Sequence, residues 1–220
     1  MNRIAPPRSA SATRPITRLI PGARLRPALA AIAALLALGT ALPAAAEPDA
    51  TARAAIETST RERVAPLPKK LLDLLQTTIA EHGAAEAVSA CSEKAPAAAR
   101  KASEDTGWQI RRVSQRNRNP GGVPDAWEAK ALADFDTAVA AGADPATLER
   151  SEFVTEGGRT VFRYAKALAT QPMCVTCHGA PDGIPSDVRA RIASVYPDDR
   201  ATGFAPGQIR GALVVKRVVE

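Results

Sequence analysis

The heptapeptide MCVTCHG, residues 173–179, is the stretch around which the fold of this chain is expected to be built. Two residues separate Cys174 from Cys177, and His178 follows at once. This C-x-x-C-H pattern is typical of a site where haem c is attached. The spacing lets each thiol reach one vinyl group of the haem, and the adjacent imidazole can then bind the iron. We therefore expect one covalent haem c, linked to both cysteines, with His178 as its proximal ligand.

Other interpretations of the cysteine pair are weighed by the residues around it. A thioredoxin-like redox pair would follow a strand and open a helix, whereas here the segment GAPDG at 179–183 is loop composition. A structural zinc site needs four ligands, and only Cys91 and His82 could complete one. A disulfide between Cys174 and Cys177 would leave His178 without a purpose. A zinc-stabilised binding module stays as an alternative.

The first 46 residues differ from the rest of the chain. They hold six arginines and no acidic residue, and an apolar run from Ala28 to Leu42 ends just before the segment PAAA at 43–46. Such a charged start, apolar stretch and A-x-A site are typical of a secretory signal peptide. We predict a signal peptide over residues 1–46, cleavage after Ala46 and a periplasmic protein. The run is short for a membrane span of about 20 residues, so membrane attachment is expected only if the leader is retained as an anchor.

Removal of this leader changes the charge of the protein. The whole chain has 29 basic and 23 acidic residues and a net charge of +6. Taking away the six leader arginines leaves 23 basic residues, equal to the number of acidic ones. The basic character therefore belongs to the leader, and nucleic acid is not expected as a partner. Export also suits a c-type haem, because this group is joined to the polypeptide outside the cytoplasm.

Hydrophobic periodicity and turn residues predict the order of the elements. Residues 47–65 show no clear period and are expected to be a flexible lead-in to one domain over 66–220. Helices are expected from 67 to 82, from 84 through 91, from 96 to 103, from 125 to about 139 and from 186 to 195, and strands over 108–114, 152–155, 159–166 and 212–219. This order indicates an α+β domain with helices packed on one face of an antiparallel sheet.

Iron in haem has a second axial position, for which the chain offers few groups. Met1 lies in the leader and Met173 lies beside Cys174, so methionine is poorly placed. His82, Cys91, a lysine, water or no ligand at all are left. Cys91 is an odd thiol in an exported chain, although a small buried residue is the ordinary interpretation of such a position. The residues alone leave this ligand open.

Several short segments outside the haem motif resemble a bacterial family of exported single-haem c-type domains with a PAS-like fold, long described as a domain of unknown function. These segments are VSAC at 88–91, IRRVS at 110–114, RNP at 118–120, PDAWE at 124–128, YPDDRATG at 196–203 and RGA at 210–212. The resemblance implies a PAS-like antiparallel sheet with N-terminal helices. It also implies Cys91 as the distal axial ligand. The pair Gly121-Gly122 departs from the family, where an Ala-Asn pair is expected.

Four arginines are candidates for binding the haem propionates, because a guanidinium group matches the geometry of a carboxylate. They are Arg111, Arg112, Arg116 and Arg118. The alternative interpretation of each is a solvated residue at a strand edge or in a loop.

These patterns predict a periplasmic c-type haem protein for electron transfer, or for sensing of redox state or of a ligand, with a separate redox partner protein. A thiolate ligand stabilises ferric iron, so we expect a low reduction potential. A haem enzyme of peroxidase type is the alternative, and it needs an open distal site and an acid–base group. His82 is the one remaining histidine for that role, and a bound Cys91 would block the site. Enzymatic activity is therefore not expected.

Overall fold

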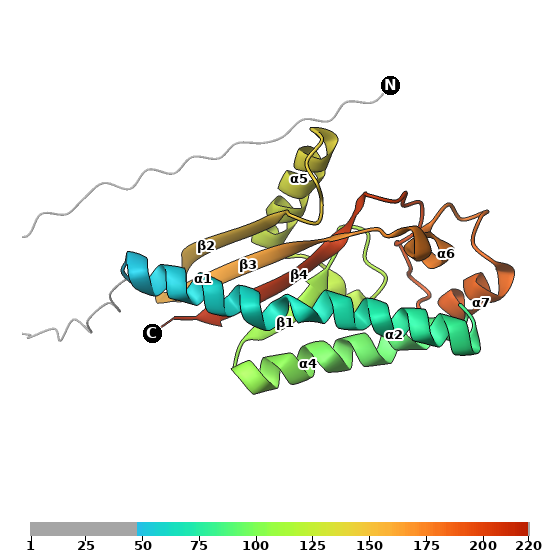
Figure 1. Ribbon diagram of the computed structural model, residues 1–220, viewed down its shortest axis with the longest axis horizontal. Helices are drawn as coiled ribbons and strands as arrows, with labels where there is room; N and C mark the ends of the chain where they lie inside the picture. The colour runs from blue at the N-terminus through green and yellow to red at the C-terminus, as the bar shows by residue number, and fades with distance from the viewer. Residues whose placement is uncertain (1–47, 220) are drawn as a thin grey trace, which may run out of the picture. The chain divides into compact units, whose positions relative to one another are not determined.

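The computed structural model describes residues 48–219, which form a four-stranded antiparallel sheet with helices on both faces (Figure 1). They belong to one of the two compact units into which the chain divides. The predicted signal peptide over 1–46 and its cleavage site lie outside the described residues. Within residues 48–219, no helix has both the length and the hydropathy that crossing a membrane requires.

The sheet has the strand order β1-β4-β3-β2, and all neighbours are antiparallel. The strands are β1 (Gln109–Val113), β2 (Glu149–Glu156), β3 (Arg159–Ala169) and β4 (Ile209–Val218). β2 and β3 form the predicted hairpin around Gly157 and Gly158, whose φ angles of 58° and 75° suit glycine. The last strand of the chain thus lies in the middle of the sheet. Burial on both faces explains its near-continuous apolar sequence.

Three long helices cover one face of this sheet (Figure 1). They are α1 (Ala50–Val64), α2 (Pro66–His82) and α4 (Ala95–Thr106). α1 begins at Asp49, whose carboxylate accepts a hydrogen bond from the Ala52 N–H at 2.8 Å. Ile56 and Val64 of α1 are buried against Phe162 of β3. The prediction of a flexible lead-in over 47–65 is therefore wrong, because this segment is a helix that covers part of the core, and the domain begins before residue 66.

After α2 the chain turns at Gly83 and enters an unbroken helical stretch. This stretch consists of α3 (Ala87–Ser89), a π-helical turn η1 (Ala90–Lys94) and then α4. In η1 the N–H of Ala95 donates to the carbonyl of Ala90, five residues back. A π-turn holds one residue more than an α-helical turn with the same ends, and such turns are frequent at functional sites. Cys91 lies in this turn.

α5 (Ala126–Ala140) covers the opposite face of the sheet (Figure 1). Its predicted capping box is confirmed: the Asp125 carboxylate accepts from the Glu128 N–H at 3.0 Å, and the Glu128 carboxylate accepts from the Asp125 N–H at 2.8 Å. Phe135 packs against Ala165 and other small residues of β3 and β4. The prediction that helices lie on one face is therefore wrong, because the central strands present apolar side chains to both faces and each face needs a cover.

The segment between β3 and β4 carries the C-x-x-C-H motif. It contains η3 (Pro172–Cys174), α6 (Val175–His178) and α7 (Ser186–Val195), the last with its predicted bounds. Val188 and Ile192 of α7 form a buried cluster with Val88 of α3, and Cys177 packs against this cluster. The cluster therefore fixes the motif against the helical stretch that carries Cys91.

Candidate functional site

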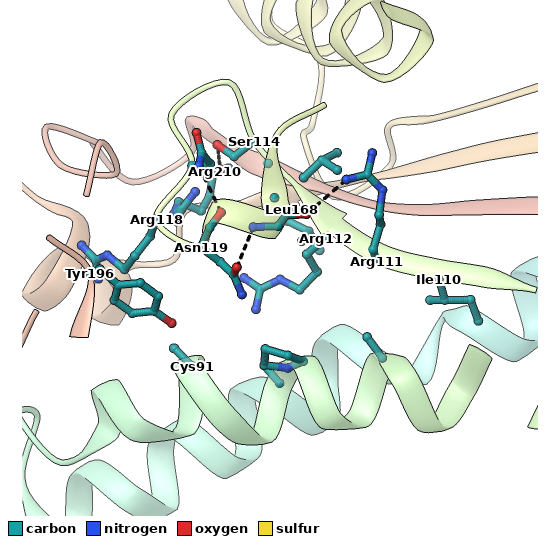
Figure 2. A pocket seen from close by; sticks show the side chains of 18 of the residues that line it. Cys91, Ile110, Arg111, Arg112, Ser114, Arg118, Asn119, Leu168, Tyr196 and Arg210 are labelled. Carbon is teal, nitrogen blue, oxygen red and sulfur yellow. Dashed lines mark hydrogen bonds between the residues drawn. The ribbon is translucent and has the colours of Figure 1, made fainter. Parts of the chain in front are cut away.

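A cavity of ≈ 350 Å³ lies between the sheet and the helical stretch η1–α4 (Figure 2). The helical stretch supplies mostly small residues to its wall, the sheet supplies apolar and cationic ones, and the C-terminal loops supply polar and aromatic ones. The main lining residues are Cys91, Ala95, Pro96, Ala99, Ile110, Arg112, Leu168, His178, Tyr196 and Arg210. This size and this mixture of apolar wall with few polar groups are typical of sites for small molecules and cofactors.

The absence of side-chain bulk keeps this cavity open. Ala95, Pro96 and Ala99 are the α4 residues that face it, together with Arg100. On the sheet side lies Gly211, where an added Cβ would stand 2.3 Å from the Val113 carbonyl oxygen. Any other residue at this position would push β4 away from β1. The close approach of two strands under a wall of small residues therefore leaves a space for a ligand.

The structure brings two of the predicted iron ligands to the wall of this one cavity. Cys91 reaches it from the π-turn, and His178 reaches it as the last residue of α6. Cys174 and Cys177 lie in η3 and α6, directly before His178, and all three cysteines are free thiols. Burial raises the pKa of Cys177 to about 11, although the nearby cation of Arg118 opposes this rise. The roles of these four residues in binding haem stay predictions.

The imidazole of His178 is held in a single tautomer. Its Nδ1 lies 2.7 Å from the carbonyl oxygen of Ala201, which can only accept, so Nδ1 carries the proton. The Arg210 Nε, 3.3 Å from the same nitrogen, therefore makes a polar contact and no hydrogen bond. Burial, followed by the cations of Arg210 and Arg118, lowers the pKa of His178 well below its ordinary value. The ring is thus neutral at neutral pH, with the lone pair on Nε2, as metal-binding histidines require.

Arg118 fixes the backbone of the motif. Its guanidinium donates from Nε and Nη2 to the two Asp199 carboxylate oxygens, both at 3.0 Å, and from Nη2 to the carbonyl oxygen of Cys177 at 2.7 Å. The side chains of Arg118 and Asp199 are only 6% and 11% exposed. A buried bidentate pair of this kind is rigid. Arg118, predicted as a propionate partner, therefore holds the loop that carries His178, although it also borders the cavity.

The other predicted arginines divide between two environments. Arg111 borders the cavity, but its guanidinium is engaged with Glu128 and with the carbonyl oxygens of Gly121 and Val123, to which it donates. Arg116 donates to the carbonyl oxygen of Thr202 and lies 3.6 Å from the ring centroid of Phe204, at a second cavity of ≈ 460 Å³ beside α5. These two side chains are thus engaged with the protein itself.

Arg112 alone among the four predicted arginines has a buried donor without a partner. Its Nε is inaccessible to solvent and makes no hydrogen bond. Figure 2 shows its side chain between β1 and the helix that carries Cys91. Such an orphaned donor is costly, and in a native protein it calls for an explanation such as a missing ligand. Arg112 is therefore the cation best placed to receive an anionic group.

Sequence reasoning missed Arg210 and Tyr196 as site residues. Burial, with the neighbouring cations of Arg112 and Arg118, lowers the pKa of Arg210 to about 9, so its charge persists at neutral pH beside His178. Tyr196 is only 7% exposed, and burial followed by the nearby Cys91 raises the pKa of its phenol. Both stand in segments that resembled the family, and that was the available signal.

His82 does not join this site. It is the last residue of α2, its side chain is 62% exposed, and it lies 3.6 Å from Glu81. Over residues 48–219, no cluster of three or more Cys, His, Asp or Glu side chains has a geometry that could hold a metal ion. The four-ligand arrangement required by the zinc alternative is thus not found in the described part of the chain.

These features define a class of protein: an α+β domain whose antiparallel sheet and helical cover enclose a site with a thiol and an imidazole in its wall. The chain belongs to the Tll0287-like family, whose model matches residues 41–217, and the family resemblance seen in the sequence is confirmed. The crystal structure of the cyanobacterial haem protein Tll0287 is similar in fold, with a TM-score of 0.59, 24% identity, and coverage of 79% of this chain and 98% of that one. No curated protein matches the sequence.

Proposed function

We propose that this protein is a PAS-like c-type haem protein that holds one covalent haem c in the cavity between the sheet and η1–α4. Cys174 and Cys177 are the thioether links, His178 is the proximal ligand and Cys91 is the distal ligand. One observation carries the proposal: Cys91 and a neutral, oriented His178 line the same cavity, although they lie far apart in the sequence.

The residues of the cavity fit such a group in three respects. The donor set of one thiol and one imidazole suits iron. The wall of alanines, Pro96, Ile110 and Leu168 suits the apolar face of a macrocycle. The orphaned Nε of Arg112 suits a propionate, which would satisfy the buried donor. When bound, the haem supplies a one-electron couple at its iron.

The protein's own residues set the conditions for that couple. Ala201 orients the His178 ring through Nδ1, and Arg118 ties the Cys177 carbonyl to Asp199. An anionic thiolate from Cys91 favours the ferric state, so the reduction potential is low. Positive charge at Arg112 and Arg210 opposes this effect and sets a lower limit on how far the potential falls.

The role that follows is periplasmic electron transfer, or sensing of redox state or of a ligand, through a separate redox partner protein. The predicted signal peptide over 1–46 supports export, where c-type haem is attached. A peroxidase-type enzyme is disfavoured because Cys91 would close the distal position and because His82 does not line the cavity.

The test is visible and EPR spectroscopy of protein exported from a host that attaches haem c, together with a haem stain on a denaturing gel. Wild type should retain haem on the gel and show a low-spin thiolate signal. Cys91→Ala should retain the haem but lose that signal, while Ser89→Ala, two residues earlier, should keep both. A wild type without covalent haem would overturn the proposal, and an unchanged signal in Cys91→Ala would exclude Cys91 as ligand.

A further inference from the structure

Tyr196 is a buried phenol in the wall of the cavity, at the same end as Cys91. It directly follows α7 and packs in the cluster formed with Val88 and Ile192. Its backbone is held on both sides, because its N–H donates to the Ile192 carbonyl at 2.7 Å and its own carbonyl accepts from the Asp199 N–H at 3.1 Å. The ring therefore has a fixed direction, and Figure 2 shows its hydroxyl pointing toward the helix that carries Cys91.

Cys91 of the π-turn faces this hydroxyl (Figure 2) and interacts with it electrostatically. The next residue, Ser92, is engaged elsewhere, because its hydroxyl donates to the Ser89 carbonyl at 3.2 Å. Cys91 and Tyr196 also border the same cavity. A phenol can donate one proton and accept another at the same time. A thiolate that binds iron still accepts hydrogen bonds, and the Tyr196 hydroxyl is the donor that faces Cys91 at this cavity.

We propose that Tyr196 donates a hydrogen bond to the sulfur of Cys91. It is a positioning residue, because it acts on the reduction potential of the haem through Cys91. The inference rests on the proposed function, because it needs Cys91 at the iron. Hydrogen bonds to a metal-bound sulfur withdraw electron density from it and raise the reduction potential. Tyr196 would thus offset part of the thiolate's stabilisation of ferric iron. It would also fix the direction of the Cys91 side chain.

The chain holds two tyrosines, which provide a matched pair of variants. Tyr164 is also buried, but its hydroxyl donates to Glu149 at 2.9 Å and it does not line the cavity. Tyr196→Phe and Tyr164→Phe each remove one buried hydroxyl from an intact ring. In a redox titration of the haem-loaded protein, Tyr196→Phe should lower the ratio of reduced to oxidised haem at fixed potential about tenfold, a midpoint shift of ~59 mV for one electron.

Tyr164→Phe should leave the midpoint in place, and both variants should retain the haem. Equal midpoints for wild type and Tyr196→Phe, with thiolate ligation present in both, would overturn this inference and leave the proposed function intact. Loss of the thiolate signal in wild type would instead overturn the proposed function. A second measurement needs no variant: the Fe–S stretch in resonance Raman spectra of wild type should shift between H₂O and D₂O. A stretch that stays fixed would also refute the hydrogen bond.

Discussion

Arg111 and Arg112 are neighbours on β1, and their side chains meet opposite faces of the sheet. Arg111 lies on the α5 face and donates to Glu128 and to two carbonyl oxygens. Arg112 lies on the face covered by η1 and α4, where its Nε is buried without a partner. On the α5 face Arg163 is likewise paired, with Asp125 and Glu156.

The difference between the two faces separates stability from binding. Where an arginine finds its carboxylate within the protein, it stabilises the fold and has no capacity left for a ligand. Where the fold buries a guanidinium nitrogen and provides no acceptor, the unpaired donor lowers the stability of the fold, and binding of an anionic ligand is favoured. Adjacent residues of one type thus have different functions, and the alternation of a strand decides which is which.

The largest effect is expected from Arg118, the paired arginine within the site. Arg118→Ala leaves Asp199 buried without its cation and releases the Cys177 carbonyl. Breaking a buried pair on one side costs about 3–5 kcal/mol, which urea unfolding would measure. Haem retention on a denaturing gel should fall as well. Arg200→Ala, at an exposed neighbour, should change neither. A loss below about 1 kcal/mol would show that this pair does not hold the motif.

Effects of intermediate size on stability and on the haem midpoint should distinguish Arg111 from Arg112. Arg111→Gln removes the cation beside Glu128 and should lower the free energy of unfolding by about 1–2 kcal/mol without a change in the haem midpoint. Arg112→Gln should change stability by less than about 0.5 kcal/mol and should lower the midpoint, because a cation near the haem favours the reduced state. Titrations of both variants check this. The reverse pattern would contradict the division between the faces.

The smallest effect is expected on the pH dependence of stability, from the carboxylates of Asp125, which caps α5, and Asp136, which lies within α5. Partial burial alone would raise the pKa of Asp125, but hydrogen bonds from the Glu128 N–H and from Arg163 outweigh it, so the pKa lies below its ordinary value. Asp125 thus stabilises the fold at neutral pH, and this contribution is lost as the pH falls through about 4 and lower. Asp125→Asn should flatten the acid side of the stability profile.

Asp136 provides the opposite sign within the same helix. Burial raises its pKa, with Arg116 opposing, so its charged form destabilises the fold at neutral pH and the penalty fades as the pH falls. Asp136→Asn should therefore slightly stabilise the protein at pH 7. Thermal unfolding between pH 3 and 7 measures both variants, and parallel profiles for the two would contradict these directions.

Local signals predicted much of this fold. The capping box at Asp125 and Glu128, the glycine hairpin after β2 and the bounds of α7 depend on neighbours in sequence, and each is confirmed. α1 was missed because few of its residues are apolar, and its burial of Ile56 and Val64 depends on a sheet formed much later in the chain.

The site divides in the same way. The C-x-x-C-H motif is local, so its position could be predicted, and the structure places Cys91 and His178 at one cavity. Which arginines form ion pairs depends on the tertiary structure. No local pattern shows that Arg118 pairs with Asp199 or that the Nε of Arg112 lacks an acceptor. The burial of Arg210 and Tyr196 also arises only when the C-terminal loops meet the helical stretch.

The π-turn at Ala90–Lys94 makes the length of this segment as important as its composition. Each residue of an α-helix turns the chain by about 100°, but the wider π-turn fits one additional residue between the same ends, so only the side chains within the turn change direction. Before the turn Val88 faces the α7 cluster, and after it Ala95 and Ala99 face the cavity. Deleting one residue here would restore a uniform α-helix with the same ends, which leaves these two surfaces in place but changes the direction of Cys91 within the turn. The position of Cys91 at the cavity should therefore depend on the number of residues in this turn as well as on the cysteine itself.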